Sequence, residues 1–258
     1  IEVASPTVTL QVLTIRHAAT DRVSLEPGAG VLCAAARLTV KNCVLFHNGG
    51  SGVSSAGPVT ITASEFLYNR LAIDITGDGA VIKKCQIHDD GAGGMRITGN
   101  GALIQGNDLL RIDDGLGIEI IGADAMVKKN TIDNTCGSQI HITGDRAQLI
   151  DNDLRRANGA GVEVCGDDAV VSGNQIDRCD GGDGIDVEGG DADILNNVVT
   201  FAADDGIDVN GKDAEVEDNT ISRCGDRGVS IVGNEGKVQR NTISDSGDSG
   251  IRVTGDEA

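Results

Sequence analysis

Acidic side chains and one histidine recur at a regular interval along this chain, at positions where they could act together. Triplets of the form apolar–polar–apolar follow one another about every 21 to 23 residues. Their central residues are Asp74, Arg96, Glu119, His141, Glu163, Asp186, Asp208, Ser230 and Arg252. If successive triplets stack, carboxylates this dense could bind a cation such as calcium or act as general acid and base. His141, between two glutamates, could then transfer protons.

The rest of the chain repeats in step with these triplets. Ten units begin at Leu38, Val59, Ala80, Ala102, Ala125, Ala147, Ala169, Ala192, Ala214 and Gly236. Apolar residues alternate with polar ones inside each unit, and β-branched residues and glycine dominate, which indicates short strands and excludes helices. A period of about 22 residues is typical of a solenoid. About three strands per unit make one coil, and coils stack about 4.8 Å apart.

We therefore expect an all-β fold, a single-stranded parallel β-helix of about eleven coils. Residues 1–37 are expected to form irregular N-terminal coils, and residues 38–258 the regular repeats of one continuous domain. From Asn107 onward, the sixth residue of every unit is asparagine. An inward asparagine at a turn can donate to the asparagine of one neighbouring coil and accept from that of the other, so these residues predict a buried asparagine ladder.

These repeats resemble the right-handed parallel β-helix of the pectin lyase-like superfamily, over nearly the whole chain. The resemblance implies that the strand of Val171 belongs to the second sheet and that Ile176 lies on the third, with Asn174 at the tight turn between them. It places the triplet Ile185–Val187 on the first sheet.

The outward face of this first sheet is the candidate site. Neighbouring coils would hold carboxylates about 5 Å apart and alternate coils about 10 Å apart, which brackets both glycosidase geometries. We expect Glu119, Glu163, Asp186, Asp208 and Arg96 to contact substrate, and Asp186 and Asp208 to hold calcium if it binds. The alternative is an ordinary solvated sheet face.

A resemblance to polygalacturonase-like hydrolases of the superfamily adds catalytic candidates. Gly182-Asp183-Gly184-Ile185-Asp186 is similar to their Asn-Thr-Asp-Gly motif, and Ala203-Asp204-Asp205-Gly206-Ile207 is similar to their Asp-Asp motif. The resemblance implies that Asp183, Asp204 and Asp205 are catalytic carboxylates, with His141 nearby as a proton carrier. The chain departs from the pattern at Gly225-Asp226-Arg227-Gly228, where the family has Gly-His-Gly, and the later Arg-Ile-Lys motif is missing.

The charge and the aromatic content of the chain limit which partners we expect. The formal net charge of −19 repels phosphates, so nucleic acids and anionic membranes are not expected partners. Such a charge suits cations, or calcium that bridges to an acidic polysaccharide. The chain has no Trp and one Tyr, which counts against a sugar site built from aromatic rings.

Two functional classes remain open. The first is a carbohydrate-active module, either a polysaccharide-binding one or a glycoside hydrolase or lyase. The second is a non-catalytic structural β-helix of a surface, adhesin or tail-fibre protein. Both predict an extracellular or cell-surface location. Because the repeats stop without a cap, we also expect end-to-end or flanking-domain contacts at the two ends.

Overall fold

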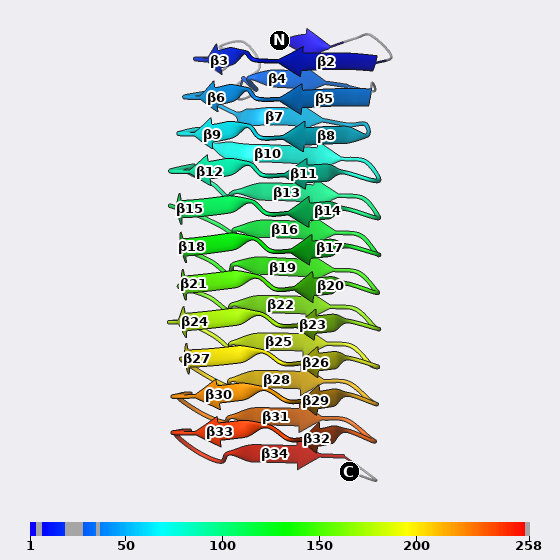
Figure 1. Ribbon diagram of the computed structural model, residues 1–258, viewed down its shortest axis with the longest axis vertical. Helices are drawn as coiled ribbons and strands as arrows, with labels where there is room; N and C mark the ends of the chain where they lie inside the picture. The colour runs from blue at the N-terminus through cyan, green and yellow to red at the C-terminus, as the bar shows by residue number, and fades with distance from the viewer. Residues whose placement is uncertain (4–6, 19–27, 35–36, 256–258) are drawn as a thin grey trace.

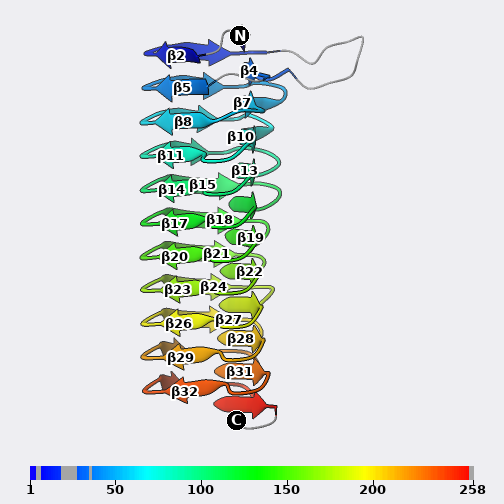
Figure 2. The same ribbon diagram turned by 90° about the vertical axis from the view of Figure 1, so that its right-hand side faces the viewer.

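The computed structural model describes residues 1–3, 7–18, 28–34 and 37–255, and over these residues the chain is a stack of three-stranded coils. Figure 1 shows the coils following one another down the long axis, with the N- and C-termini at opposite ends. All strand pairs are parallel, and each strand pairs with the strands one coil before and one coil after it. Figure 2 shows the second-sheet and first-sheet strands along opposite edges of the stack.

The described residues form three sheets, with 12, 11 and 11 strands. The first sheet holds, in stacking order, β1 (Glu2–Val3), β4 (Val31–Cys33), β7 (Ser51–Ser55), β10 (Leu71–Thr76), β13 (Met95–Thr98), β16 (Ile118–Ile121), β19 (Ile140–Thr143), β22 (Val162–Cys165), β25 (Ile185–Glu188), β28 (Ile207–Asn210), β31 (Val229–Val232) and β34 (Ile251–Thr254).

The second sheet holds β2 (Thr7–Gln11), β5 (Arg37–Lys41), β8 (Val59–Thr62), β11 (Val81–Lys83), β14 (Leu103–Gln105), β17 (Met126–Lys128), β20 (Gln148–Ile150), β23 (Val170–Ser172), β26 (Asp193–Leu195), β29 (Glu215–Glu217) and β32 (Lys237–Gln239). The third sheet holds β3 (Thr14–Arg16), β6 (Val44–Phe46), β9 (Glu65–Leu67), β12 (Gln86–His88), β15 (Asp108–Ile112), β18 (Thr131–Thr135), β21 (Asp153–Ala157), β24 (Gln175–Cys179), β27 (Val198–Ala202), β30 (Thr220–Ser222) and β33 (Thr242–Ser244).

The expected parallel β-helix of about eleven coils is confirmed. The assignment to sheets is also as expected, with Val171 in the second sheet, Ile176 in the third and Ile185 in the first. The division at residue 37 stays a prediction, because residues 4–6, 19–27 and 35–36 lie outside the described part of the chain. The described residues include no helix of the length and apolarity that crossing a membrane would require.

The core runs along the inside of the stack because side chains alternate between the two faces of every strand. In β25, Ile185 and Val187 have no exposed surface and belong to the continuous apolar core. Asp186, between them, is partly exposed on the outward face. The period-two pattern in each triplet therefore determines which side chains reach the solvent.

The predicted asparagine ladder is confirmed at the turn between the second and third sheets. Asn174 Nδ2 donates to Asn197 Oδ1 at 3.0 Å and to the Leu149 carbonyl at 2.9 Å. The same oxygen of Asn197 accepts the backbone N–H of Asn174 at 2.9 Å. Asn174 in turn accepts both donors of Asn152. The ladder joins Asn107, Asn130, Asn152, Asn174, Asn197, Asn219 and Asn241.

We expect Asn174→Ala to lower the free energy of unfolding by on the order of 1–2 kcal/mol. The substitution leaves the Nδ2 and backbone N–H of Asn152 buried without their shared acceptor. Chemical denaturation followed by circular dichroism measures the change, and Gln175→Ala at the neighbouring exposed residue is the control. Equal effects of the two substitutions would contradict the ladder.

A second, shorter ladder lies at the turn between the third and first sheets, and the sequence analysis did not predict it. Asn48 Nδ2 donates to Asn69 Oδ1 at 2.8 Å, and the backbone N–H of Asn69 donates to Asp90 Oδ1 at 2.5 Å. All three side chains are buried. Asp90 Oδ2 is also buried and has no hydrogen-bond partner. The ladder therefore ends in a buried carboxyl group.

Candidate functional site

The central residues of the triplets form one column on the outward face of the first sheet. In the strand register, Asp74 pairs with Arg96, Arg96 with Glu119, and Glu119 with His141. The column continues through Glu163, Asp186, Asp208, Ser230 and Arg252. The structure thus brings together all of the predicted substrate-binding residues.

Ion pairs organise the N-terminal half of this column. Arg96 Nε lies 2.7 Å from Glu119 Oε2, and His141 Nδ1 lies 2.8 Å from Glu163 Oε2. The hydrogen bond from His141 lowers the pKa of Glu163, and the same bond raises the pKa of His141. The hydroxyl of Ser138, which sequence reasoning missed, donates to the other oxygen of Glu163 at 2.8 Å. The carboxylate of Glu163 therefore favours the protonated form of His141.

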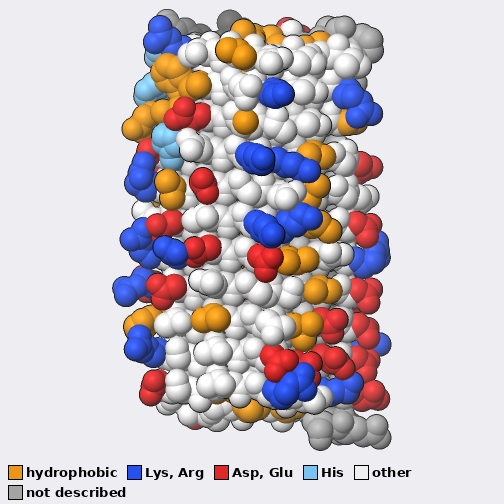
Figure 3. All heavy atoms as spheres, in the orientation of Figure 1, with side chains coloured by type: hydrophobic (Ala, Val, Ile, Leu, Met, Phe, Trp, Pro, Cys, Tyr) orange, Lys and Arg blue, Asp and Glu red, His pale blue; other side chains and the backbone are white. Residues whose placement is uncertain are grey.

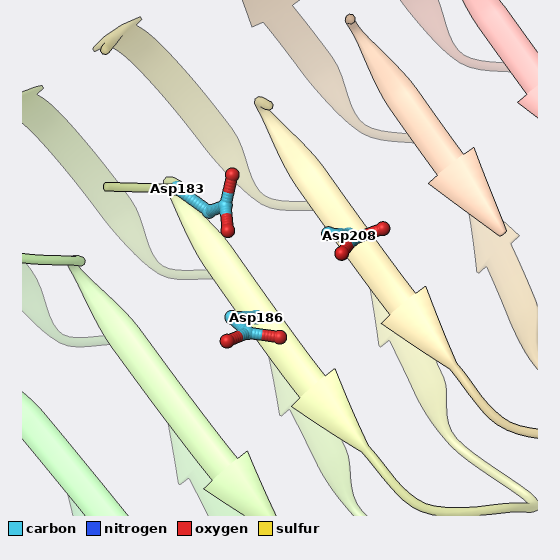
Figure 4. A group of neighbouring side chains, drawn as sticks. All are labelled: Asp183, Asp186 and Asp208. Atoms are coloured by element: carbon cyan, nitrogen blue, oxygen red, sulfur yellow. The ribbon is translucent and has the colours of Figure 1, made fainter. Parts of the chain in front are cut away.

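Three carboxylates gather in the C-terminal half of the column. Asp183, Asp186 and Asp208 each place one oxygen within 4.8 Å of the others, and all three are half-buried. Figure 4 shows Asp186 on β25, Asp208 on β28 and Asp183 at the start of β25, with the carboxylates near one another. We call these three residues the aspartate cluster.

Two members of the aspartate cluster have raised pKa values. Burial raises the pKa of Asp183 to about 7, and the charges of Asp186 and Asp208 add to this effect. Burial also raises the pKa of Asp186 to about 6, with the charge of Asp208 as the next cause. Like charges this close disfavour ionisation of all members together. The cluster therefore combines protonated and ionised carboxyl groups near pH 7.

The remaining predicted catalytic aspartates lie outside this cluster. Asp205 is buried, and its Oδ1 accepts the backbone N–H of Arg227 at 2.6 Å while its Oδ2 lies 3.3 Å from Arg227 Nη1. The backbone N–H of Asp205 donates to Asp183 Oδ1 at 2.7 Å. Asp204 is exposed, and its side chain forms no polar contact within the described residues. The roles inferred for these aspartates stay predictions.

Sequence reasoning assigned only Asp186 and Asp208 to a cation, and it did not join Asp183 to them. Strict alternation would place residues three apart on opposite faces of a strand. Asp183 precedes β25, however, so alternation does not fix the direction of its side chain. Arg227 was not singled out from the sequence either, although it pairs with Asp205.

Fold and register together define the class as a parallel β-helix with an acidic first-sheet face. A family model described as "right handed beta helix region" matches residues 29–169 and 116–258, so the chain belongs to this family. The right-handedness that the resemblance implied is thereby confirmed. No curated protein matches the chain significantly.

Solved structures similar to this chain include two kinds of enzyme. The catalytic unit of a thermostable α-1,3-glucanase from Streptomyces thermodiastaticus aligns with a TM-score of 0.65 and 12% identity, covering 97% of this chain and 63% of the glucanase unit. A double mutant of the periplasmic alginate epimerase AlgG aligns with a TM-score of 0.56 and 14% identity, covering 96% of this chain and 68% of the epimerase. Another AlgG structure has a TM-score of 0.51 and 13% identity, with coverages of 98% and 79%. At these identities the likeness concerns the fold alone.

Proposed function

We propose that this chain is a polysaccharide-cleaving module that hydrolyses glycosidic bonds on the acidic face of its first sheet. One observation carries the proposal, namely three carboxylates with oxygens within 4.8 Å of one another, two of them with raised pKa values. Glycoside hydrolysis requires a protonated carboxylic acid beside an ionised carboxylate. The aspartate cluster can supply both at neutral pH.

The pKa values of Asp183 and Asp186 suggest which of the two acts as the acid. Asp183 has a pKa of about 7 and is the general acid that protonates the leaving oxygen. Asp186, whose pKa is about 6, would supply the ionised carboxylate, and Asp208 lies beside it on the adjacent strand. The short oxygen separation is nearer to the roughly 5 Å of retaining enzymes than to the wider spacing of inverting ones. Asp205 holds Asp183 through its backbone N–H, so its role is positioning.

The rest of the column would bind the sugar chain on the N-terminal side of the cluster. His141, Glu163 and Glu119 offer charged donors and acceptors in register on β19, β22 and β16. Asp204, exposed at the turn before β28, could reach a bound sugar from the other side. The solved structures named above include a glucanase and an alginate epimerase, which supports a polysaccharide as the substrate class. An extracellular or periplasmic location would suit such a substrate.

Calcium binding by the same cluster is the second candidate, and the oxygen geometry favours it. Two oxygens on opposite sides of a calcium ion, each about 2.4 Å away, lie about 4.8 Å apart, so three oxygens within that limit can share one ion. Asp183, Asp186 and Asp208 would be the ligands. A bound ion would stabilise the ionised form of Asp183 and prevent it from acting as an acid. Calcium would then support a lyase, or bridge an acidic polysaccharide to the face.

A panel of acidic and neutral polysaccharides, each assayed with calcium and with chelator, tests these alternatives. We expect new reducing ends without the ultraviolet absorbance of unsaturated products, and we expect activity to persist in chelator. Unsaturated product that disappears with chelator would establish the calcium lyase instead. No cleavage of any polysaccharide in the panel would contradict both the hydrolase and the calcium lyase, and would favour the structural β-helix of a surface, adhesin or tail-fibre protein.

Substitution of the acid tests the residue assignment. We expect Asp183→Asn to lower kcat by roughly 100-fold or more, the usual contribution of general acid catalysis. Asp193→Asn is the matched control, because Asp193 lies on the outward face of the second sheet and is also partly exposed. Unchanged kcat in Asp183→Asn would remove Asp183 from the mechanism.

A further inference from the structure

A second surface of the stack carries stacked aromatic and cationic side chains. In eleven coils of the described chain, a residue within one position of the last residue of the third-sheet strand adopts a positive φ. We call this row the edge column. Its members are His17, His47, Tyr68, Asp89, Arg111, Asn134, Arg156, Arg178, Phe201, Arg223 and Asp245. Figure 3 shows histidine, hydrophobic and Lys or Arg side chains along the left edge, over the third-sheet strands of Figure 1.

Side chains of the edge column contact one another from coil to coil. The rings of His17 and His47 stack at 5.7 Å between centroids, and those of His47 and Tyr68 stack at 4.9 Å. Arg111 donates to both oxygens of Asp89 in the preceding coil, at 2.6 and 2.8 Å. The column is therefore an ordered surface along the stack.

In the C-terminal part of the edge column, two arginines contact an aromatic ring instead of a carboxylate. The guanidinium carbons of Arg178 and Arg223 lie 5.6 and 4.7 Å from the ring centroid of Phe201, which comes from the coil between them. Arg111 and Arg156 have carboxylate partners in Asp89 and Asp133. Within the described residues, Arg178 and Arg223 form no ion pair and no side-chain hydrogen bond. Their N–H donors remain available to a ligand, while contact with the ring limits their motion.

An open surface pocket of about 400 Å³ lies beside Arg223 at the turn between the third and first sheets. Phe201 and Arg223 line it together with Asp180 and Asp245. The lining thus offers guanidinium donors for a carboxylate and aspartate acceptors for hydroxyl groups. A sugar acid presents both kinds of group.

We propose that Arg178, Phe201 and Arg223 bind the carboxylated sugars of an acidic polysaccharide. The two arginines lie two coils apart, which is about 10 Å along the stack. An extended chain that runs along the stack can therefore give each guanidinium its own carboxylate. The inference rests on the proposed function for the polymer class, and it adds direct recognition of the carboxylate without calcium.

Binding of labelled uronic acid oligomers, from polygalacturonate and from alginate, tests the site in chelator by fluorescence anisotropy. We expect the full chain to bind an acidic oligomer, and we expect the double variant Arg178→Gln/Arg223→Gln to bind it roughly tenfold or more weakly. Arg146→Gln is the matched control, because Arg146 is exposed, pairs with Asp124 and lies on the turn between the first and second sheets. Phe201→Gly, which suits the φ of 61°, should also weaken binding.

Four results would contradict the proposed binding site. These are unchanged binding by the double variant, equal binding of neutral oligomers of the same length, equal binding of a single-stranded oligonucleotide, and no binding of either uronate. The two proposals can fail separately. Uronate binding without cleavage of any polysaccharide in the panel would contradict the hydrolase and leave this site standing. If the full chain cleaves a polysaccharide and the double variant still binds uronate normally, the hydrolase stands and this binding site is contradicted.

Discussion

Ile185→Asp is expected to prevent stable folding, whereas Asp186→Ala, one residue along β25, is expected to change stability little. Ile185 has no exposed surface and pairs in register with Val162 and Ile207 of the adjacent coils. An aspartate there would place a carboxylate in the apolar core without a partner, which costs several kcal/mol. The side chain of Asp186 points outward, and its removal leaves the core intact.

Thermal and denaturant unfolding, followed by circular dichroism, measures both variants. Ile185→Val separates loss of size from introduction of charge, and it should cost only about 1 kcal/mol. Similar losses of stability in the Asp and Ala variants would contradict the strand register. Because the first-sheet column depends on this register, the candidate site would be lost with it.

Asp90→Asn is expected to stabilise the protein at neutral and alkaline pH, because it removes a buried negative charge. The Oδ1 atom of Asp90 accepts the backbone N–H of Asn69, and its buried Oδ2 atom has no partner. In the preceding coil, Asn69 Nδ2 donates to the carbonyl of Leu45, 24 residues earlier. An asparagine at position 90 could donate in the same way to the carbonyl of Phe66 and so extend the ladder.

The pH dependence of stability follows from the same carboxyl group. Burial raises the pKa of Asp90 to about 7 in the folded protein, from an ordinary value of 3.8. Between these values the folded state binds more protons than the unfolded state, so stability falls as pH rises from about 4 to about 7. The shift corresponds to roughly 4 kcal/mol. The raised pKa values of Asp183 and Asp186 act in the same direction.

Melting temperatures at pH 4.5 and pH 8 check this prediction. We expect the melting temperature of Asp90→Asn to exceed that of the wild type clearly at pH 8 and only slightly at pH 4.5. Asp108→Asn, at an exposed position on β15, is the control and should leave the pH dependence unchanged. A lower melting temperature of Asp90→Asn at pH 8 would show that the buried carboxylate is stabilised by a group other than those described.

The repeat was sufficient to predict the fold and the first-sheet column. A pattern that recurs in successive coils determines strands, sheets and register at once. The asparagines from Asn107 onward and the apolar residues on either side of each outward triplet residue are such patterns. The Asn48–Asn69–Asp90 ladder was missed because it spans only three coils. The edge column was missed because its backbone conformation repeats while its side chains do not, as Tyr68, Arg178 and Phe201 illustrate.

The sequence does not predict which aspartates of the candidate site lie together, and the reason is different. Asp183 and Asp205 occupy equivalent positions two residues before β25 and β28, so the sequence treats them alike. In the structure Arg227 pairs with Asp205, and Asp183 remains to join Asp186 and Asp208. A single arginine one coil further on separates their environments, and the repeat pattern does not contain that information.

Carbon-13 NMR titration of the aspartate carboxyl groups, assigned with Asp183→Asn and Asp186→Asn, tests most directly whether the aspartate cluster can supply an acid and a base. We expect Asp183 to titrate near pH 7 and Asp186 near pH 6, well above the ordinary value of 3.8. We also expect Asp193→Asn to leave both titrations unchanged. If both carboxyl groups titrate near pH 4 in chelator, the cluster is an ordinary acidic surface and the proposed hydrolytic mechanism is wrong.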